Sequence, residues 1–331
     1  MPKIKLASLA YVHYRHQDLR KEEEFLRDFG LTEARREDQR VYYKGTGPQP
    51  ITYIAEQAEG PGDGQRFIAA AWNVESLEDL TNASQLPSAS TVDACPHPGT
   101  GKMITLTDPN GFEIRLHHGQ EMEEECFGSA TAINQPWHKP RKGESVRVQP
   151  RPSRVHKLGH YGFMVPPDDF QHTLQWYTST FNLSITDSVF DPTSGEDKTC
   201  FIHIDKREVY SDHHSFFLGQ TEQDRAHIHH ASFEVQDLDD QLLGHDWLKG
   251  KAWTNCWGVG RHVLGSQIFD YWFDAMGNIL EHYIDGDIVN RATPYRREPE
   301  SPSSLYVWGP NVPLGFVTGR VEDAHTPAIA A

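Results

Sequence analysis

The hydrophobic and polar positions of this chain follow one pattern that occurs four times. In the first occurrence, an apolar run over residues 4–14 predicts a strand, and apolar residues at helical spacing predict a helix over residues 18–29. Gly30 is placed to end that helix, because glycine readily adopts the left-handed conformation of a C-terminal cap. Glycine and proline then separate three shorter predicted strands, over residues 33–36, 40–43 and 51–55.

The same order of a strand, a helix and three strands returns in three further copies. Their first strands are predicted over residues 66–74, 158–165 and 227–235, and their helices over residues 77–83, 168–181 and 238–248. The other predicted strands cover residues 90–92, 103–107, 112–117, 184–188, 199–205, 213–218, 253–257, 267–274 and 278–284. Internal repetition at this scale indicates that one structural unit recurs along the chain.

A unit of this βαβββ type forms a small curved sheet with one helix on its outer face, and two units side by side enclose a cavity. We therefore expect an α+β fold in which four units pair into two domains, each with a curved mixed sheet around a cavity; the length of 331 residues fits two domains. The predicted parts are an N-terminal domain over residues 1–119, a polar linker over 120–154, a C-terminal domain over 155–290 and a tail over 291–331. We expect the tail to cover the site of the C-terminal domain or to be partly disordered.

Composition narrows the range of partners. The chain has 47 acidic and 31 basic residues and a formal charge of −16, so its surface should repel nucleic-acid phosphates and anionic lipids. We therefore expect neither nucleic acid nor a membrane as a partner. The four cysteines show no C-x-x-C spacing, which argues against a disulfide framework and a cysteine zinc site. No signal peptide and no apolar run of about 18 residues is present in the sequence, so a cytoplasmic location is expected.

Glu281 lies in the apolar, aromatic strand predicted over residues 278–284, where a carboxylate is costly to bury without a positive partner. His160 and His230 each stand five residues before the valine that ends the first strand of their unit, so they hold equivalent positions. Each of the three residues alone could be an ordinary core or edge residue. Together, two histidines and one carboxylate lining one cavity form the arrangement that binds one face of Fe(II) and leaves its other positions open.

The N-terminal units provide an internal comparison. Ser8, Ala69 and Arg115 stand at the places that the two histidines and the glutamate hold in the C-terminal units. These three residue types cannot bind such a metal together. The scaffold is therefore duplicated, and we expect the N-terminal domain to be catalytically degenerate.

Three segments of the C-terminal half resemble the motifs of a known family. They are Leu-Gly-His160, His-His230-Ala-Ser-Phe-Glu-Val, and Gly-Arg-His262-x8-Tyr271-x2-Asp-x2-Gly-x3-Glu281. On these residues the chain resembles the type I extradiol ring-cleaving dioxygenases, which are similar to catechol 2,3-dioxygenase. They belong to the vicinal oxygen chelate superfamily, together with glyoxalase I and the bleomycin-resistance proteins. The resemblance covers about residues 4–290 and is strong only in the C-terminal domain.

Two further segments extend the resemblance. Asp212-His-His214-Ser-Phe-Phe-Leu is similar to the segment that carries another histidine of the family, so its role is transferred to His214, with His213 as the alternative. Trp308-Gly-Pro in the tail is similar to the C-terminal segment that closes over the site in this family.

The resemblance implies an oxidoreductase of aromatic hydrocarbon catabolism. The expected reaction is non-haem Fe(II)-dependent extradiol (meta) cleavage of a catecholic ring with incorporation of both atoms of O2. His160, His230 and Glu281 are then expected to bind the iron, for which Mn(II) is an alternative, and no organic cofactor is expected. The partners are a catechol and O2, and a homo-oligomer is expected because family members commonly form multimers.

The resemblance also implies three catalytic residues. His262 and Tyr271 are expected to hydrogen-bond the phenolic oxygen of the bound substrate. His214 is expected to stabilise the bound oxygen species and to act as general acid when the O–O bond breaks.

Two alternatives from other functional classes remain. A glyoxalase- or epimerase-like metalloenzyme would act through a base on an enediolate and needs a further protein ligand or a carboxylate base, for which the sequence offers no clear candidate. A metal-free small-molecule binding protein of the same superfamily would require that the three predicted ligands hold no metal. The sequence leaves open the ring substituent and the choice between proximal and distal cleavage.

Overall fold

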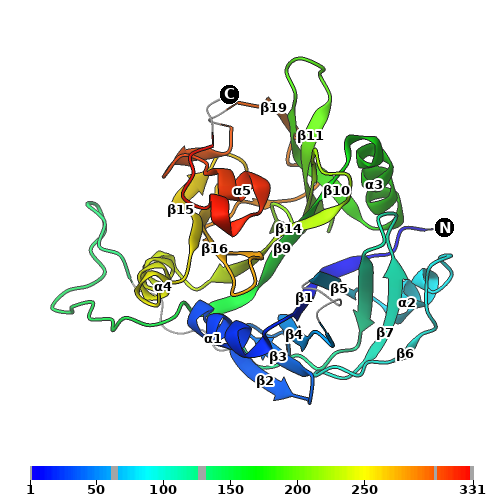
Figure 1. The fold of residues 1–331 in the computed structure, drawn as a ribbon, viewed down its shortest axis with the longest axis horizontal. Helices are drawn as coiled ribbons and strands as arrows, with labels where there is room; N and C mark the ends of the chain where they lie inside the picture. Colours follow the sequence, from blue (N-terminus) through cyan, green and yellow to red (C-terminus); the bar gives the residue numbers. More distant parts are fainter. Residues whose placement is uncertain (1, 61–65, 126–131, 302–303, 329–331) are drawn as a thin grey trace.

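The chain folds into two large mixed β-sheets with few helices, one sheet from each half (Figure 1). The computed structural model describes residues 2–60, 66–125, 132–301 and 304–328. Parts of the predicted linker (126–131) and of the predicted tail (302–303 and 329–331) lie outside the described residues. The predicted α+β fold of βαβββ units is confirmed by the order of the elements and by the two sheets.

The N-terminal half contains two such units. The first consists of β1 (Leu6–His16), α1 (Leu19–Phe29), β2 (Thr32–Arg36), β3 (Arg40–Lys44) and β4 (Tyr53–Gln57). The second consists of β5 (Arg66–Val74), α2 (Leu77–Ala83), β6 (Asp93–Ala94), β7 (Lys102–Thr107) and β8 (Glu113–His118). The strands form one sheet in the order β2-β3-β4-β1-β5-β8-β7-β6, and the two units join where β1 pairs antiparallel with β5.

The C-terminal half repeats this plan and adds strands at both edges. The third unit consists of β9 (Val155–Val165), α3 (Pro167–Thr180), β10 (Leu183–Phe190), β11 (Asp197–Ile204) and β13 (Phe216–Gln220). The fourth consists of β14 (His227–Val235), α4 (Leu238–Gly250), β15 (Asn255–His262), β16 (Ile268–Phe273) and β17 (Ile279–Ile284). The added elements are β12 (Ser211–Asp212), β18 (Ile288–Val289), β19 (Arg296–Pro299), β20 (Tyr306–Trp308), α5 (Leu314–Thr318) and a 3-10 turn (Val321–Asp323). The sheet order is β19-β10-β11-β13-β9-β14-β17-β16-β15-β20, and β12 pairs with β18.

Three of the described helices begin at a short polar residue that caps the backbone, and α1 ends at a glycine. The Asp18 carboxylate accepts a hydrogen bond from the Lys21 amide and caps α1, and Ser76 and Asp237 cap α2 and α4 in the same way. Gly30 ends α1 in the left-handed conformation, with φ of 107°. Side-chain caps therefore set the starts of α1, α2 and α4, whereas α3 begins at Pro167 without a side-chain cap.

The N-terminal half supports the last strand of the fourth unit. The ring of His282 on β17 stacks on Phe29 with 3.7 Å between centroids, and its Nε2 lies 2.7 Å from the Phe29 carbonyl oxygen, to which it donates. The indole N–H groups of Trp247 and Trp253 both donate to the Asp28 carboxylate. Since Glu281 adjoins His282, this contact between the halves holds the strand that carries the predicted carboxylate ligand.

Several predicted strands differ from the structure in their bounds; the strand predicted over residues 253–257, for example, is β15, which covers Asn255–His262. Residues 90–92 are not a strand, because β6 forms over Asp93–Ala94 and pairs there with β7. The strand predicted over residues 213–218 begins at Phe216, so both histidines of that segment precede it. The backbone of His213 is held elsewhere, since its amide donates to the Asp287 carbonyl and its own carbonyl accepts from the Thr186 hydroxyl.

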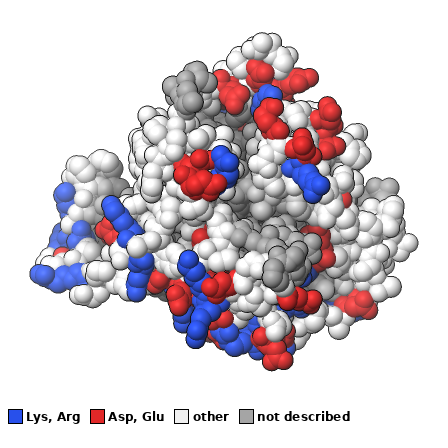
Figure 2. Space-filling view, viewed as in Figure 1, with Lys and Arg blue, Asp and Glu red and all other residues white. Residues whose placement is uncertain are grey.

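None of the described helices has the length and apolar character needed to cross a membrane. Figure 2 shows Lys and Arg at the left of the view, over the projecting linker, and along the lower part of the face, whereas Asp and Glu are spread over the whole face.

Candidate metal centre

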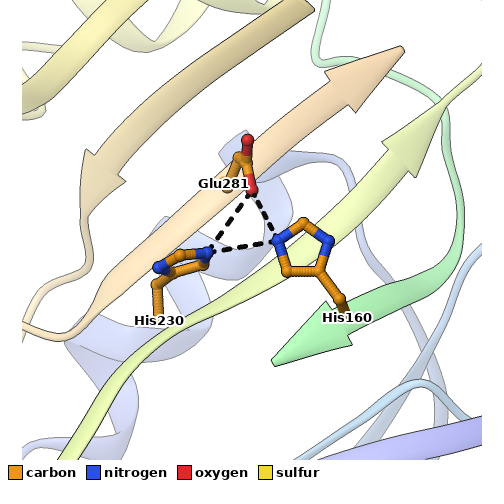
Figure 3. Close-up of side chains that lie close together, drawn as sticks. All are labelled: His160, His230 and Glu281. Carbon is orange, nitrogen blue, oxygen red and sulfur yellow. Dashed lines mark hydrogen bonds and ion pairs between the residues drawn. The ribbon is translucent and has the colours of Figure 1, made fainter. Parts of the chain in front are cut away.

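Three side chains of metal-binding type meet inside the C-terminal sheet (Figure 3). His160 comes from β9, His230 from β14 and Glu281 from β17. The Nε2 atoms of the two histidines are 3.2 Å apart. Glu281 Oε2 lies 3.1 Å from His160 Nε2 and 3.7 Å from His230 Nε2. The structure thus brings together the three residues predicted as ligands.

The register of three neighbouring strands explains this convergence. Ser232 on β14 lies opposite His160 on one side and opposite Glu281 on the other, and aligned residues of adjacent strands point to the same face. The small side chain of Ser232 leaves room between the two larger ones. His230 stands two residues before Ser232, so strand alternation places it on that same face.

The three residues fit a bound divalent metal. All three are buried, and neither oxygen of Glu281 makes an aligned hydrogen bond within the described part of the chain. An isolated buried carboxylate is strongly unfavourable, and its polar neighbours are nitrogens of the two histidines. Bonds of about 2.1 Å at right angles place neighbouring ligand atoms about 3 Å apart, close to the separations given above. Two imidazoles and one carboxylate form a donor set suited to Fe(II).

His262 and Tyr271 lie beside the carboxylate of this group. Tyr271 on β16 is directly opposite Glu281 on β17, and His262 Nε2 is 3.9 Å from Glu281 Oε1. His262 Nδ1 is 2.7 Å from the Leu305 carbonyl, which can only accept, so this nitrogen carries the proton. His262 Nε2 is therefore free to accept the hydrogen bond of the Tyr271 hydroxyl at 2.9 Å.

Burial sets the protonation of both residues. It lowers the pKa of His262 and raises the pKa of Tyr271 well above its ordinary value, and the nearby Glu281 charge raises the Tyr271 pKa further. At neutral pH the pair is therefore a neutral imidazole and an intact phenol, which together offer one proton acceptor and one hydrogen-bond donor.

His214 packs against the predicted ligand His160, with 4.0 Å between ring centroids. Its Nδ1 is 3.1 Å from His213 Nδ1, and His213 Nε2 lies 2.8 Å from Asp187 Oδ2. Because the carboxylate accepts from His213 Nε2, a neutral His213 accepts at Nδ1 from His214, whose Nε2 is then unprotonated. Burial, and then the neighbouring histidines, lower the pKa of His214 well below its ordinary value, so the ring is neutral. Of the two adjacent histidines, His214 contacts the candidate metal-binding group, which is His160, His230 and Glu281. His213 orients the ring of His214.

The N-terminal half has a different network at the equivalent place. Arg115 lies opposite Ala71, as Glu281 lies opposite Ser232. The Arg115 guanidinium donates to His13 Nδ1 at 3.0 Å and to Glu113. A cation and its partners thus occupy the position at which the other half has a carboxylate.

Three residues that hold histidines of the C-terminal site, Asp187, His229 and Phe316, were not among the predicted site residues. Asp187 holds His213, as described above. His229 Nδ1 is 2.7 Å from His230 Nδ1, and His229 Nε2 is 2.9 Å from the carbonyl oxygen of Phe316 in α5. The two histidine doublets were visible in the sequence, but their partners come from other elements and have no local signal.

The chain is similar in sequence to known proteins. Residues 157–281 match the Glyoxalase/Bleomycin resistance protein/Dioxygenase superfamily. Metapyrocatechase 2 of Cupriavidus necator is 28% identical over 313 residues, which cover 91% of this chain and 88% of that protein.

Solved structures agree on the fold. A Mn(II)-bound glyoxalase from Novosphingobium aromaticivorans superposes with a TM-score of 0.76 at 18% identity, covering 94% of this chain and 93% of that one. Homoprotocatechuate 2,3-dioxygenase from Brevibacterium fuscum, in complex with 3,4-dihydroxyphenylacetate, gives a TM-score of 0.75 at 17% identity, covering 96% and 93%. At these identities the likeness establishes the fold alone.

Proposed function

Because the chain is a vicinal oxygen chelate protein related along most of its length to a metapyrocatechase, we propose that it is an extradiol dioxygenase that opens a catecholic ring. The observation that carries this proposal is the buried group of His160, His230 and Glu281 with a neutral histidine on one side and a histidine–tyrosine pair on the other. The reaction breaks the ring bond next to the two hydroxyls, places one atom of O2 on each carbon of that bond, and gives a coloured semialdehyde.

The proposed metal is Fe(II), with Mn(II) as the alternative that the same donor set accepts. His160 and His230 would bind it through Nε2, and Glu281 through its carboxylate. When bound, the metal would lower the pKa of a catechol hydroxyl and bring the substrate and O2 together.

Tyr271 and His262 would hold the two substrate oxygens in different protonation states. The Tyr271 hydroxyl now donates to His262 Nε2 and can turn to donate to a deprotonated oxygen of the catechol. His262 Nε2 then accepts from the hydroxyl that keeps its proton, while its Nδ1–H stays on the Leu305 carbonyl. The pair therefore favours the monoanion over the neutral catechol and over the dianion.

His214 would carry the proton that the substrate loses. Its neutral Nε2 accepts the proton of one hydroxyl, and the ring returns that proton to oxygen when the O–O bond breaks. The Asp187–His213 pair stabilises the charged ring that exists between these two steps. This use of one residue as base and then acid balances the proton within the site.

Oxygen uptake separates this proposal from the glyoxalase-like alternative and from metal-free binding. The protein is loaded anaerobically with Fe(II) and mixed with a panel of substituted catechols in an oxygen electrode, and a parallel sample receives a hemithioacetal. We expect one O2 consumed per catechol and a coloured product. Isomerisation of the hemithioacetal without oxygen uptake on any catechol would favour the glyoxalase-like reading, and neither reaction would favour a binding protein.

A further inference from the structure

Among the described residues, His229 connects the group of His160, His230 and Glu281 to the C-terminal helix α5 by hydrogen bonds, beside a ring contact of 6.4 Å between His230 and Phe316. His229 lies between the ligand His230 and the main chain of the tail, and it hydrogen-bonds to both, at 2.7 Å through Nδ1 and at 2.9 Å through Nε2. No other contact of this kind fixes the ligands within the described residues, since His160 Nδ1 has no hydrogen-bond partner there.

The carbonyl at one end determines the proton positions along this connection. A carbonyl oxygen only accepts, so His229 Nε2 must carry a proton. A neutral imidazole that donates through Nε2 accepts through Nδ1, so His229 Nδ1 is the acceptor toward His230. His230 Nδ1 must then be the donor, which leaves the lone pair of His230 on Nε2, the atom that faces Glu281. The Phe316 carbonyl thus selects the His230 tautomer that can bind a metal.

The ring of Phe316 packs helix α5 onto the walls of the site, and the Trp257 indole N–H donates to the Pro310 carbonyl just before this helix. This ring packs against Trp257 and Tyr271, with centroids 4.8 and 4.9 Å away, and edge-on against His229 at 4.8 Å. The next residue, Val317, points outward and is 60% exposed. The position of the Phe316 carbonyl therefore depends on whether its own side chain stays docked on the walls of the site.

We propose that His229 is a positioning residue that couples docking of α5 to the metal affinity of the site, an inference that rests on the proposed metal function. With α5 docked, His230 presents its Nε2 lone pair. With α5 displaced, His229 is free to adopt its other tautomer and no longer enforces that state. Coupling of this kind is reciprocal, so bound metal must also favour the docked tail. The ligands are buried, and substrate exchange requires movement of what covers them.

The histidine pair His213–His214 differs from the pair His229–His230 in the group that holds its outer histidine. His213 orients His214 in the same way, but its outer partner is the Asp187 side chain on β10, within the sheet. A sheet residue offers a constant acceptor, whereas a tail carbonyl offers one that depends on docking. The acceptor for His213 is therefore always in place, whereas the acceptor for His229 is in place only when α5 is docked.

Two substitutions of His229 separate its two hydrogen bonds. In His229→Asn, the side-chain oxygen lies near the place of Nδ1 and accepts from His230 whether or not the tail is docked. In His229→Gln, the amide nitrogen lies near the place of Nε2 and can reach the Phe316 carbonyl, but the acceptor for His230 is lost. Phe316→Ala undocks α5, and Val317→Ala is the matched control on the same helix.

The test is the dissociation constant of the metal, measured anaerobically for Fe(II) and separately for Co(II) by competition with a chelator. We expect Phe316→Ala to weaken binding about tenfold, the lower end of effects from outer partners of a ligand, and Val317→Ala to leave it unchanged. His229→Gln should also bind weakly. His229→Asn should bind as the wild type does and should show no further loss when combined with Phe316→Ala. Equal losses from Phe316→Ala in both backgrounds would overturn the coupling.

Hydrogen exchange of α5 tests the reciprocal effect. Saturating Co(II) should slow exchange of the amides of residues 314–318 in the wild type but not in His229→Gln, and identical protection in both would contradict the proposal. Neither measurement uses a catechol or O2. The coupling can therefore fail in an active dioxygenase, and it can hold in a protein that proves inactive on catechols.

Discussion

Arg115 on β8 occupies the register position that Glu281 occupies on β17. Arg115 lies opposite Ala71, and Glu281 lies opposite Ser232, in the corresponding parallel strand pairs of the two halves. One half thus has a buried cation where the other has a buried carboxylate. The duplicated sheet accepts either charge, so the backbone alone does not dictate a carboxylate at this position.

Substitutions of Glu281 and of Arg115 should have different effects on metal binding, so the Arg115 variant serves as the control for the Glu281 variant. Glu281→Gln removes the charged ligand and should weaken Fe(II) binding by more than the about 10–100-fold typical of an outer partner. It should also raise the melting temperature of the metal-free protein, because a buried carboxylate without an aligned partner is removed. Arg115→Gln should lower the melting temperature, since Glu113 and His13 lose their donor, yet leave the iron content unchanged. Iron loss in Arg115→Gln would show that the hydrogen bonds of Arg115 support the metal centre of the other half.

Substitution of His214 should separate binding from turnover. His214→Asn keeps a small polar side chain but cannot accept and return the substrate proton, so kcat should fall about 10²–10⁴-fold. Iron content and the KM for the catechol should change little, because His214 packs on a ligand without being one of the three convergent groups. Steady-state oxygen uptake together with metal analysis measures both quantities. Loss of iron in this variant would mean that His214 helps hold the metal.

Asp187→Asn should lower kcat through His213, the neighbour of His214, and therefore less than the substitution of His214 itself. The amide still occupies the space beside His213, but it no longer stabilises a charged ring in the doublet. We expect a smaller fall in kcat than for His214→Asn, with iron content unchanged. An effect as large as that of His214→Asn, accompanied by a loss of folded protein, would indicate a structural role for Asp187.

Tyr271→Phe removes the hydroxyl that donates to His262 Nε2. The buried phenol is neutral, so its contribution should be a single hydrogen bond to the substrate anion, and loss of one such donor costs about 10²-fold in kcat. The catechol monoanion should also form less readily, which optical titration of the anaerobic complex would detect. An unchanged titration would place the phenol outside the substrate contacts.

A buried pair of carboxyl groups between the halves predicts a pH dependence of stability. Glu22 on α1 lies close to Asp274 in the turn between β16 and β17, together with His16. Burial, and then the charge of Asp274, raise the pKa of Glu22 well above its ordinary value, and burial raises the pKa of Asp274 to about 6. Folding therefore binds protons that the unfolded chain has released.

The two raised pKa values determine the direction in which stability changes with pH. Stability from the pair is fully present below the unfolded carboxyl pKa of about 4.5 and is lost as pH rises through 6 and beyond. Glu22→Gln should therefore unfold at a higher temperature than the wild type at pH 8, and the difference should shrink toward pH 5. Buried histidines away from this pair, such as His117, whose pKa burial lowers to about 3, cancel in this comparison of two variants. A difference that grows toward low pH would contradict the assignment.

The fold could be predicted from the sequence because one unit of strands and a helix is repeated along the chain. The predicted strands over residues 66–74 and 227–235 and the helix over 77–83 agree with β5, β14 and α2 at both ends. Their ends are set locally, by alternation, capping and turn residues. The edge strands β19 and β20 and helix α5 carry no such pattern, because they depend on a sheet edge that exists only once the other strands have folded.

The same distinction applies to the site. His160, His230 and Glu281 could be singled out because equivalent strand positions face one cavity, and the structure brings these three residues together. Asp187, His229 and the Phe316 carbonyl could not, since each acts through a contact between elements far apart in the chain. Their roles, like those of the three ligands, stay predictions that the experiments above address.

The central claim is that both atoms of one O2 enter the opened ring. The Fe(II)-loaded protein is mixed with the catechol that it turns over fastest, under 18O2, and the product is reduced with borohydride as it forms so that its carbonyl oxygen cannot exchange with water. The account predicts a ring-opened product that carries two labelled oxygen atoms in mass spectrometry. An intact ring, or an opened product without the label, would contradict it.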